Sequence, residues 1–207
     1  MNNKTKTTQN INAGDWKHAM NNLASTISTD DSRPILRYVN VTSQKDKIVM
    51  KSLDGFKMTE VVIKNISDGA EVENAEFEVN IPIVKVENKD IMFVTIAVSE
   101  DGKDVTISQM AMGGYPIIAK TYRAFKGDYV NTDQIKPNHK GEDSLTIHLS
   151  PKFLAKIMKD ISANDRDYVT IKMQRKDSTL MPIEFFGDDK GTNCVVYKLL
   201  LPVRVGG

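Results

Sequence analysis

The stretch LTIHLSPKFLAKIMKDI, residues 145–161, decides the fold class because its hydrophobic period changes from two to about 3.6 within a few residues. Apolar and polar residues alternate from Leu145 to Leu149, which predicts a strand. Ser150 and Pro151 then supply an N-cap and a first helical position. The predicted apolar face of the following helix consists of Phe153, Leu154, Ile157, Met158 and Ile161.

Strands dominate the rest of the chain. Alternation of β-branched and polar residues predicts strands over residues 35–41, 47–51, 58–64, 77–81, 94–98, 105–110 and 115–122, and three more at 169–174, 181–186 and 194–203. Asp54-Gly55 predicts a tight turn between the second and third of them. A loop at 100–103 is expected to join a hairpin.

Two further helical segments are predicted. One runs from Asp15, the expected N-cap, to Ser28, with Trp16, Met20, Leu23 and Ile27 on one face. The other comprises one or two turns between Pro82 and Asp90. The order of a strand, a helix and three strands therefore repeats, clearly at Ser150 and more weakly upstream. The expected fold class is α+β, with antiparallel sheets that carry short helices on one face.

Composition narrows the classes of function. The formal net charge is +1, so any attraction to phosphate must come from local clusters of charge. A single cysteine, Cys194, excludes an intrachain disulfide and fits a cytoplasmic location. No apolar run reaches the roughly 20 residues that a membrane span needs. Residues 1–11 are polar at their start, lack the apolar core of a secretory signal, and are expected to form a disordered tail.

Three motifs, in this order along the chain, carry a resemblance. The first is Arg33-Pro34-Ile35-Leu36 with Ser52-Leu53-Asp54-Gly55-Phe56-Lys57-Met58; the second is the segment 129–137; the third is Leu199-Leu200-Leu201-Pro202-Val203-Arg204-Val205. Together they resemble the bacterial DNA sliding clamp, the beta subunit of DNA polymerase III. The first is similar to the clamp's Thr-Asp-Gly-His-Arg-Leu turn, and the last to its C-terminal Met-Pro-Met/Val-Arg-Leu.

The resemblance implies a shortened DNA-clamp-like chain. Residues 12–137 look like one complete clamp domain, the middle one, and 138–207 look like the second half of the last domain. Polar composition between Lys126 and Asp143 marks the linker. A clamp chain has three domains of two half-units each, so about three half-units would remain here.

The resemblance also implies a pocket that binds short peptides of a DNA polymerase or other replication proteins. The matching positions are Leu36, Leu53, Gly55, Phe56, Lys57, Met58, Val130, Gln134, Ile135, Leu199, Leu201, Pro202, Val203, Arg204 and Val205. Most are apolar, as anchors for aliphatic and aromatic side chains should be. Phe56-Lys57 replaces the family's His-Arg, which changes the expected peptide preference. The alternative interpretation of Leu199 to Val205 is a terminal strand that packs in the core and binds no peptide.

Clamps contact duplex DNA through basic side chains on helices. The residues at which the resemblance implies non-specific DNA contact are Lys17, Arg33, Lys85, Lys89, Lys152, Lys156 and Lys159. The last three recur at positions i, i+4 and i+7 of one helix, opposite its apolar face. The alternative is that lysines simply fill the solvated face of an amphipathic helix.

The sequence favours a binding protein over an enzyme. His18, His139 and His148 lie far apart, with no metal-ligand spacing, and Cys194 is expected in a strand core. Turn formation explains Asp30-Asp31 and Asp188-Asp189, so no catalytic residue, metal or cofactor is expected. The leading hypothesis is a processivity or tethering factor that acts as an oligomer on DNA. The alternative is an adaptor that binds clamp-motif peptides without encircling DNA.

Overall fold

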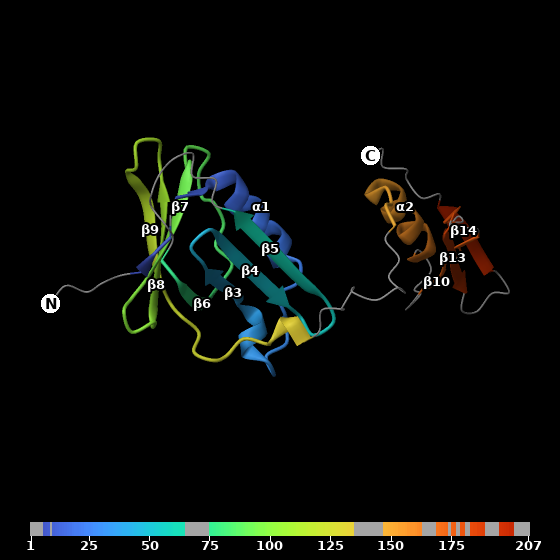
Figure 1. The fold of residues 1–207 in the computed structure, drawn as a ribbon, viewed down its shortest axis with the longest axis horizontal. Helices are drawn as coiled ribbons and strands as arrows, with labels where there is room; N and C mark the ends of the chain where they lie inside the picture. The colour runs from blue at the N-terminus through green and yellow to red at the C-terminus, as the bar shows by residue number, and fades with distance from the viewer. Residues whose placement is uncertain are drawn as a thin grey trace. The chain divides into compact units, whose positions relative to one another are not determined.

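The computed structural model of the 207-residue chain forms two compact units, Met1–Ile135 and Lys136–Gly207 (Figure 1). The residues that it describes are 6–8, 10–64, 75–134, 147–162, 169–173, 175–176, 179–180, 183–188 and 195–200. We call the described parts unit 1 and unit 2.

Unit 1 contains two antiparallel sheets and one α-helix among its described residues. One sheet has the order β5-β4-β3-β6, and the other has β1-β7-β8-β9 with β2 also paired to β7. The elements are β1 (Lys6–Thr7), β2 (Ile11–Asn12), α1 (Ala13–Ala24), the 3-10 helix η1 (Pro34–Arg37), β3 (Val39–Ser43), β4 (Lys47–Leu53), β5 (Met58–Lys64), β6 (Phe77–Ile81), β7 (Phe93–Val98), β8 (Asp104–Met110), β9 (Pro116–Arg123) and the 3-10 helix η2 (Thr132–Gln134).

Helix α1 packs into the core that both sheets share. Trp16, Ala19, Met20 and Leu23 are almost fully buried together with inward side chains of β3, β4, β7 and β8. The helix starts at Ala13, two residues before the predicted N-cap Asp15. The Asn12 side chain accepts a hydrogen bond from the Gly14 N–H at 2.7 Å, so Asn12 and not Asp15 caps the helix.

Most predicted strands are confirmed, β5 with its predicted bounds. The strand predicted from Ile35 begins only at Val39, because Pro34–Arg37 forms the 3-10 helix η1. Residues 1–11 were expected to form a disordered tail, and this is wrong for the part of them that the structure describes. Lys6–Thr7 and Ile11–Asn12 form short strands that pair with β7. Within that edge, Thr8 Oγ1 accepts a hydrogen bond from the Ile96 N–H at 3.0 Å.

The helical turns predicted between Pro82 and Asp90 are absent, and the segment is irregular. Side chains of the core satisfy its backbone groups instead. The Trp16 indole donates to the Val84 carbonyl at 2.8 Å, and the buried Gln109 carboxamide donates to the Lys85 carbonyl and accepts from the Glu87 N–H. β-Branched residues on both sides of Lys85 also disfavour a helix.

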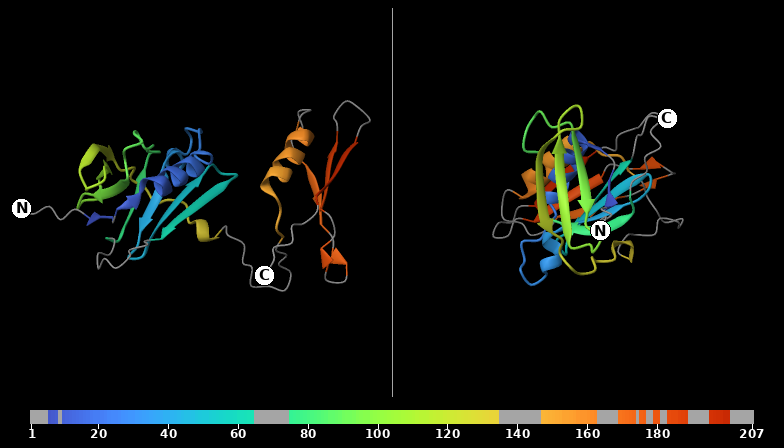
Figure 2. Two further views of the ribbon diagram at one scale, coloured as in Figure 1. Left: turned by 90° about the horizontal axis from the view of Figure 1, so that it is seen from above. Right: turned by 90° about the vertical axis from the view of Figure 1, so that its left-hand side faces the viewer.

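Unit 2 packs one helix on a small antiparallel sheet of order β10-β13-β14 (Figure 2). Its elements are α2 (Pro151–Ser162), β10 (Thr170–Lys172), β11 (Arg175–Lys176), β12 (Thr179–Leu180), β13 (Ile183–Asp188) and β14 (Val195–Leu200). The helix begins as predicted, with the Leu154 N–H bonded to the Ser150 carbonyl at 3.0 Å. Ile157, Ile183, Phe185 and Leu200 form its buried cluster.

Two predictions for unit 2 need correction. Residues 147–149, predicted as a strand, are irregular, although Ile147 and Leu149 pack against the cluster; Leu145 lies outside the described residues. Among the residues of α2 whose burial is described, Ile157 is buried and Leu154 is half-buried, whereas Phe153 and Met158 are 59% and 37% exposed. The burial of Ile161 lies outside this description, so the correction applies to Phe153 and Met158 of the predicted apolar face.

Candidate functional site: a motif turn and a polar cleft

The two parts of the first motif meet at one end of unit 1. The Ser52 hydroxyl donates to the Leu23 carbonyl at 2.9 Å and also contacts the Thr26 hydroxyl. Lys57 Nζ donates to the Ser25 carbonyl at 3.4 Å. The Ser28 N–H in turn bonds the Leu36 carbonyl at 3.0 Å. The end of α1 and the loop after it are thereby fixed beside the β4–β5 turn, although the bonded residues are 26 to 32 positions apart in sequence.

The β4–β5 turn is organised by Asp54. Its carboxylate accepts hydrogen bonds from the N–H groups of Phe56 at 2.9 Å and Lys57 at 2.7 Å, and Lys57 Nζ lies 3.2 Å from it. The hydrogen bond from the Lys57 N–H has the largest effect, followed by that from the Phe56 N–H. Both hold the pKa of the Asp54 carboxyl below its usual range. Gly55 has φ +97°, a conformation that L side chains rarely adopt. The turn therefore has a fixed shape.

This turn presents one apolar side chain to solvent above a packed base. Phe56 is 97% exposed, Met58 is half-buried, and Leu36 and Leu53 are buried. Leu36 and Leu53 are thus closed to a partner at the surface, whereas Phe56 and Met58 remain accessible.

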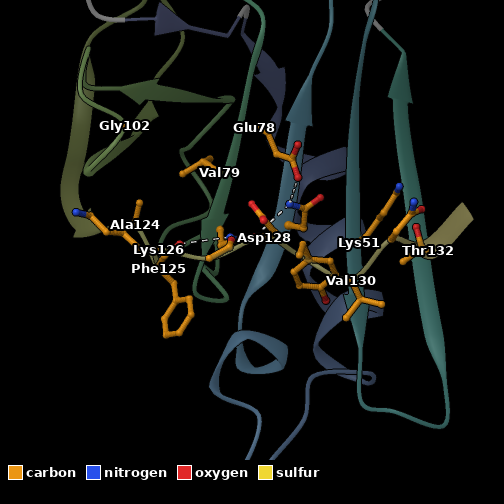
Figure 3. Close-up of a pocket in the computed structure, with 15 residues that line it drawn as sticks. Lys51, Glu78, Val79, Gly102, Ala124, Phe125, Lys126, Asp128, Val130 and Thr132 are labelled. Carbon is orange, nitrogen blue, oxygen red and sulfur yellow. Dashed lines mark hydrogen bonds between the residues drawn. The ribbon is translucent and has the colours of Figure 1, made fainter.

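A strap, residues 124–134, passes over the outer face of the β5-β4-β3-β6 sheet and borders a polar cleft of about 520 Å³ (Figure 3). Asn80 Nδ2 holds the strap by donating to the carbonyls of Phe125 at 3.3 Å and Gly127 at 3.1 Å. The Phe125 ring packs on Tyr38, with centroids 4.8 Å apart. In the floor, Asn40 Nδ2 donates to Glu78 at 2.8 Å and to Asn80 at 3.1 Å.

The strap also contains Val130 and Gln134 from the predicted pocket. Val130 lines the cleft and is 41% exposed, and Gln134 is exposed. Beside Val130, burial raises the pKa of the Tyr129 phenol to about 12, against an opposing effect of the Leu53 backbone. Sequence reasoning missed the cleft, although Asn40, Glu78 and Asn80 at outward positions of β3 and β6 were a usable signal.

The remaining predicted pocket residues belong elsewhere. Leu199 lies in β14 of unit 2. Ile135, Leu201, Pro202, Val203, Arg204 and Val205 lie outside the described residues. The structure therefore brings together the unit 1 members Leu36, Leu53, Gly55, Phe56, Lys57 and Met58, with Val130 on the adjoining strap.

All seven residues predicted to contact DNA are exposed. Lys17 lies on α1, and Arg33 in the loop beside Gly55. Lys152, Lys156 and Lys159 lie on α2, on the side away from the buried Ile157. Lys85 and Lys89 do not form a helical pair, because their segment is irregular.

The Asp and His side chains that were considered for catalysis or metal binding make local structural contacts in the described part of the chain. The Asp30 carboxylate accepts hydrogen bonds from the Ser32 N–H at 2.8 Å and hydroxyl at 2.7 Å, and Asp31 pairs with Arg37, so both serve a turn. His18 contacts Asn22 one turn further along α1. Within the described part of the chain, no group of three His, Cys, Asp or Glu gathers at metal-binding distance, and no helix is long and apolar enough to cross a membrane. His139 and Cys194 lie outside it.

Comparison with solved structures assigns the fold. The chain is similar to the DNA polymerase sliding clamp of Bacillus subtilis, with a TM-score of 0.71, 18% identity, and coverage of 100% of this chain and 51% of that one. The fold is that of a bacterial DNA sliding clamp. The beta subunit from the DNA polymerase of Streptococcus pyogenes gives 0.69 and 17% over 99% and 52% of the two chains, and the C. crescentus beta sliding clamp 0.70 and 12% over 98% and 51%.

The chain spans about half the length of these clamps. No protein-family profile and no curated protein sequence matches it. The predicted α+β clamp-like fold is therefore confirmed by structure and not by sequence similarity. At this level of identity the likeness extends to the fold, and the roles of single residues have to be argued from their own chemistry.

Proposed function

We propose that this chain is a clamp-like tethering factor that contacts duplex DNA without sequence preference and recruits replication proteins through short peptides. The observation that carries the proposal is the clamp fold over nearly the whole chain, together with the position of the Arg33 side chain beside Gly55, where the two parts of the first motif meet. A processivity role, non-enzymatic and cytoplasmic, follows from the proposal. Residues 12–137 would act as a complete clamp-like domain and 138–207 as a half domain.

For peptide recruitment, the accessible anchors of unit 1 are Phe56, Met58 and Val130. They combine apolar surface with the charged rim of Lys57, as peptide-binding surfaces commonly do. Leu199, Leu201 and Arg204 of the C-terminal motif are proposed as further contacts of the peptide. A partner peptide with aliphatic and aromatic anchors would bury Phe56, whose ring is now almost fully hydrated.

Peptide recruitment can be tested by fluorescence anisotropy with a labelled peptide that carries one leucine and one phenylalanine anchor. Met58→Asp and Leu201→Asp should each weaken binding at least tenfold, because each places a charge against an apolar anchor. Val62→Asp is the matched control, since Val62 is 45% exposed on β5 outside the predicted pocket. Equal losses in all three variants would refute the pocket.

For DNA contact, the strongest candidates are Lys152, Lys156 and Lys159. They lie exposed on one side of α2, so phosphate contact would not disturb the buried Ile157. Replacing all three by glutamine should lower the slope of log affinity against log salt by about 3, near one unit per phosphate contact. A triple variant of exposed lysines outside the predicted set, Lys6, Lys64 and Lys126, serves as the control. A slope unaltered by the α2 variant would remove α2 from the DNA-contacting surface.

A ring-incompetent adaptor is the second candidate, and one observation favours it. The segment from Pro82 to Asp90 is not a helix, so the described part of unit 1 offers one helix where two were expected to face DNA. Sedimentation of the full chain separates the two candidates. A closed multimer, retained on nicked circular DNA and released by linearisation, supports the tethering factor. A monomer that binds peptide and leaves circular DNA freely supports the adaptor.

A further inference from the structure

Within the described part of the chain, strand β5 forms an open edge of the β5-β4-β3-β6 sheet (Figure 1). We infer that this edge is an interface for a second copy of the chain, whose β5 pairs with it antiparallel about a twofold axis at Val62. The two copies of the sheet would then form one continuous sheet. The dimer requires neither DNA nor peptide, so it can hold even where the proposed function fails.

The other sheet edges of unit 1 are covered or irregular. Strands β1 and β2 pair along β7, and the strap bonds β6 through the Phe125 N–H and the Asn80 carbonyl at 3.2 Å. Strand β9 begins with Pro116, which lacks an N–H, and its pairing with β8 contains a register shift. Strand β5 pairs with β4 along all seven of its residues without a shift. A long, regular edge is a template for a further strand.

The backbone of β5 presents hydrogen-bonding groups to this edge at every second residue. The Asp54 N–H donates to the Lys57 carbonyl at 3.2 Å, which makes residues 54 and 57 a hydrogen-bonded pair. Bonded and non-bonded pairs alternate along antiparallel strands. Glu60, Val62 and Lys64 therefore direct their N–H and carbonyl groups away from β4. These groups can meet those of an identical strand when a twofold axis passes through Val62.

One register makes the segment 60–64 complementary to itself. With Val62 opposite Val62 of the second copy, Glu60 faces Lys64 on both sides of the axis, and Val61 faces Ile63. Cross-strand pairs of β-branched residues and of opposite charges stabilise a sheet. An axis one residue to either side places a charge opposite Val62, and an axis two residues to either side places like charges opposite each other. Charge complementarity therefore favours a second copy in this register.

The core beneath β5 is incompletely covered. Val61 and Ile63 pack against the core of unit 1 but are only half-buried, whereas Met50 and Ile48, opposite them on β4, are fully buried. On the outer face of the sheet, Val62 is 45% exposed. A second β5 would cover these three side chains. Removal of their apolar surface from water would add to the backbone hydrogen bonds.

The charged residues of β5 also favour the pairing. Lys64 lies directly opposite Lys47 within its own sheet, and like charges in that arrangement are unfavourable. Glu60 of the second copy would offset this repulsion. The Glu60 carboxylate lies 3.8 Å from Lys51 Nζ. Because a carboxylate has acceptor sites for more than one donor, it can keep Lys51 and also accept Lys64 of the second copy.

Charge reversal tests the interface by sedimentation velocity of the full chain. The wild-type chain should dimerise with a Kd on the order of 10 µM, since the interface is at the small end of specific ones. Glu60→Lys and Lys64→Glu should each weaken the dimer about tenfold or more, because each makes the facing positions alike in charge. An equimolar mixture of the two variants should dimerise again, since opposite charges then face each other at both positions. Reversal is needed because loss of an exposed ion pair alone changes little.

Cross-linking tests the register. In a Cys194→Ser background, Val62→Cys should give a disulfide-linked dimer on mild oxidation, because residue 62 meets its own copy on the axis. Lys64→Cys is the matched control, exposed on the same face of the same strand. Its two copies would lie about 13 Å apart, four residues along an extended strand, which is too far for a disulfide.

Val62→Asp separates this dimer from the proposed function. Two carboxylates at the axis should make the variant monomeric, while it still binds the peptide with leucine and phenylalanine anchors, because Phe56 and Met58 lie outside the segment 60–64. Thermal melting checks that each variant is folded. A wild-type chain that stays monomeric, charge variants that do not recover on mixing, or equal cross-linking at residues 62 and 64 would each overturn the interface. Failure of peptide binding alone would overturn peptide recruitment and leave the dimer standing.

Discussion

Helices α1 and α2 have the same length, 12 residues, yet they are held differently. The buried side chains of α1 pack within a core formed by two sheets, and Trp16 is fully buried. Helix α2 rests on one narrow sheet, so Phe153 remains 59% exposed. An amphipathic pattern therefore predicts a helix but not how much of its apolar face will be covered. That depends on how many sheets share the helix.

Truncating Trp16 should cause the largest loss of stability. Trp16→Ala leaves a large cavity and frees the Val84 carbonyl from its hydrogen bond, so we expect unit 1 to lose about 3–5 kcal/mol of stability. Phe153→Ala on α2 should cost below about 1 kcal/mol, because the ring is mostly hydrated. Urea denaturation followed by circular dichroism measures both. Similar losses would show that α2 is covered as fully as α1.

Truncation of Ile157 tests whether the two cores are independent. Ile157→Ala should cost about 2–4 kcal/mol, since Ile157 is the α2 residue at the centre of the unit 2 cluster. Hydrogen exchange should accelerate in peptides from unit 2 and stay unchanged in those from β3, β4 and β8. Acceleration in both units would contradict the division into separate cores.

Gly55 tests how rigidly unit 1 holds the motif turn. Gly55→Ala places a side chain at φ +97° and should cost about 1–2 kcal/mol. Gly102→Ala, at φ +67° in open space on the β7–β8 hairpin, should cost about 1 kcal/mol and leave peptide binding intact. Thermal melting of both glycine variants, and fluorescence anisotropy with the labelled peptide that carries one leucine and one phenylalanine anchor, check these expectations. Weaker peptide binding in Gly102→Ala would show that the effect is not local to the motif turn.

Titration of Tyr129 should give the smallest effect. Its pKa is raised by burial to about 12 in the folded chain, from about 10 in an unfolded one. The neutral phenol is therefore favoured by folding, and its stabilising contribution is complete below pH 10 and lost as the pH rises toward 12. Ultraviolet titration should show one late phenolate step that Tyr129→Phe abolishes. A step that persists in this variant would assign it to another tyrosine.

Local patterns sufficed for most strands and for the start of α2, because alternation and the Ser-Pro cap act within a few residues; they were wrong at residues 147–149 and at Ile35, where the chain is irregular or forms η1. They failed at Pro82–Asp90, where Trp16 and Gln109, both distant in sequence, satisfy the backbone of an irregular segment. The motif turn was visible as Asp54-Gly55. The cleft was not, because Asn40 and Asn80 become neighbours only through the β3–β6 pairing.

The burial of Trp16 has a practical consequence. It is the only tryptophan of the chain, and its indole N–H is bonded to the Val84 carbonyl inside unit 1. Intrinsic fluorescence excited at the tryptophan band therefore reports on unit 1 and does not report on unit 2. A binding event confined to α2 should leave the emission spectrum unchanged. An event that loosens the core around α1 should shift the emission to the red.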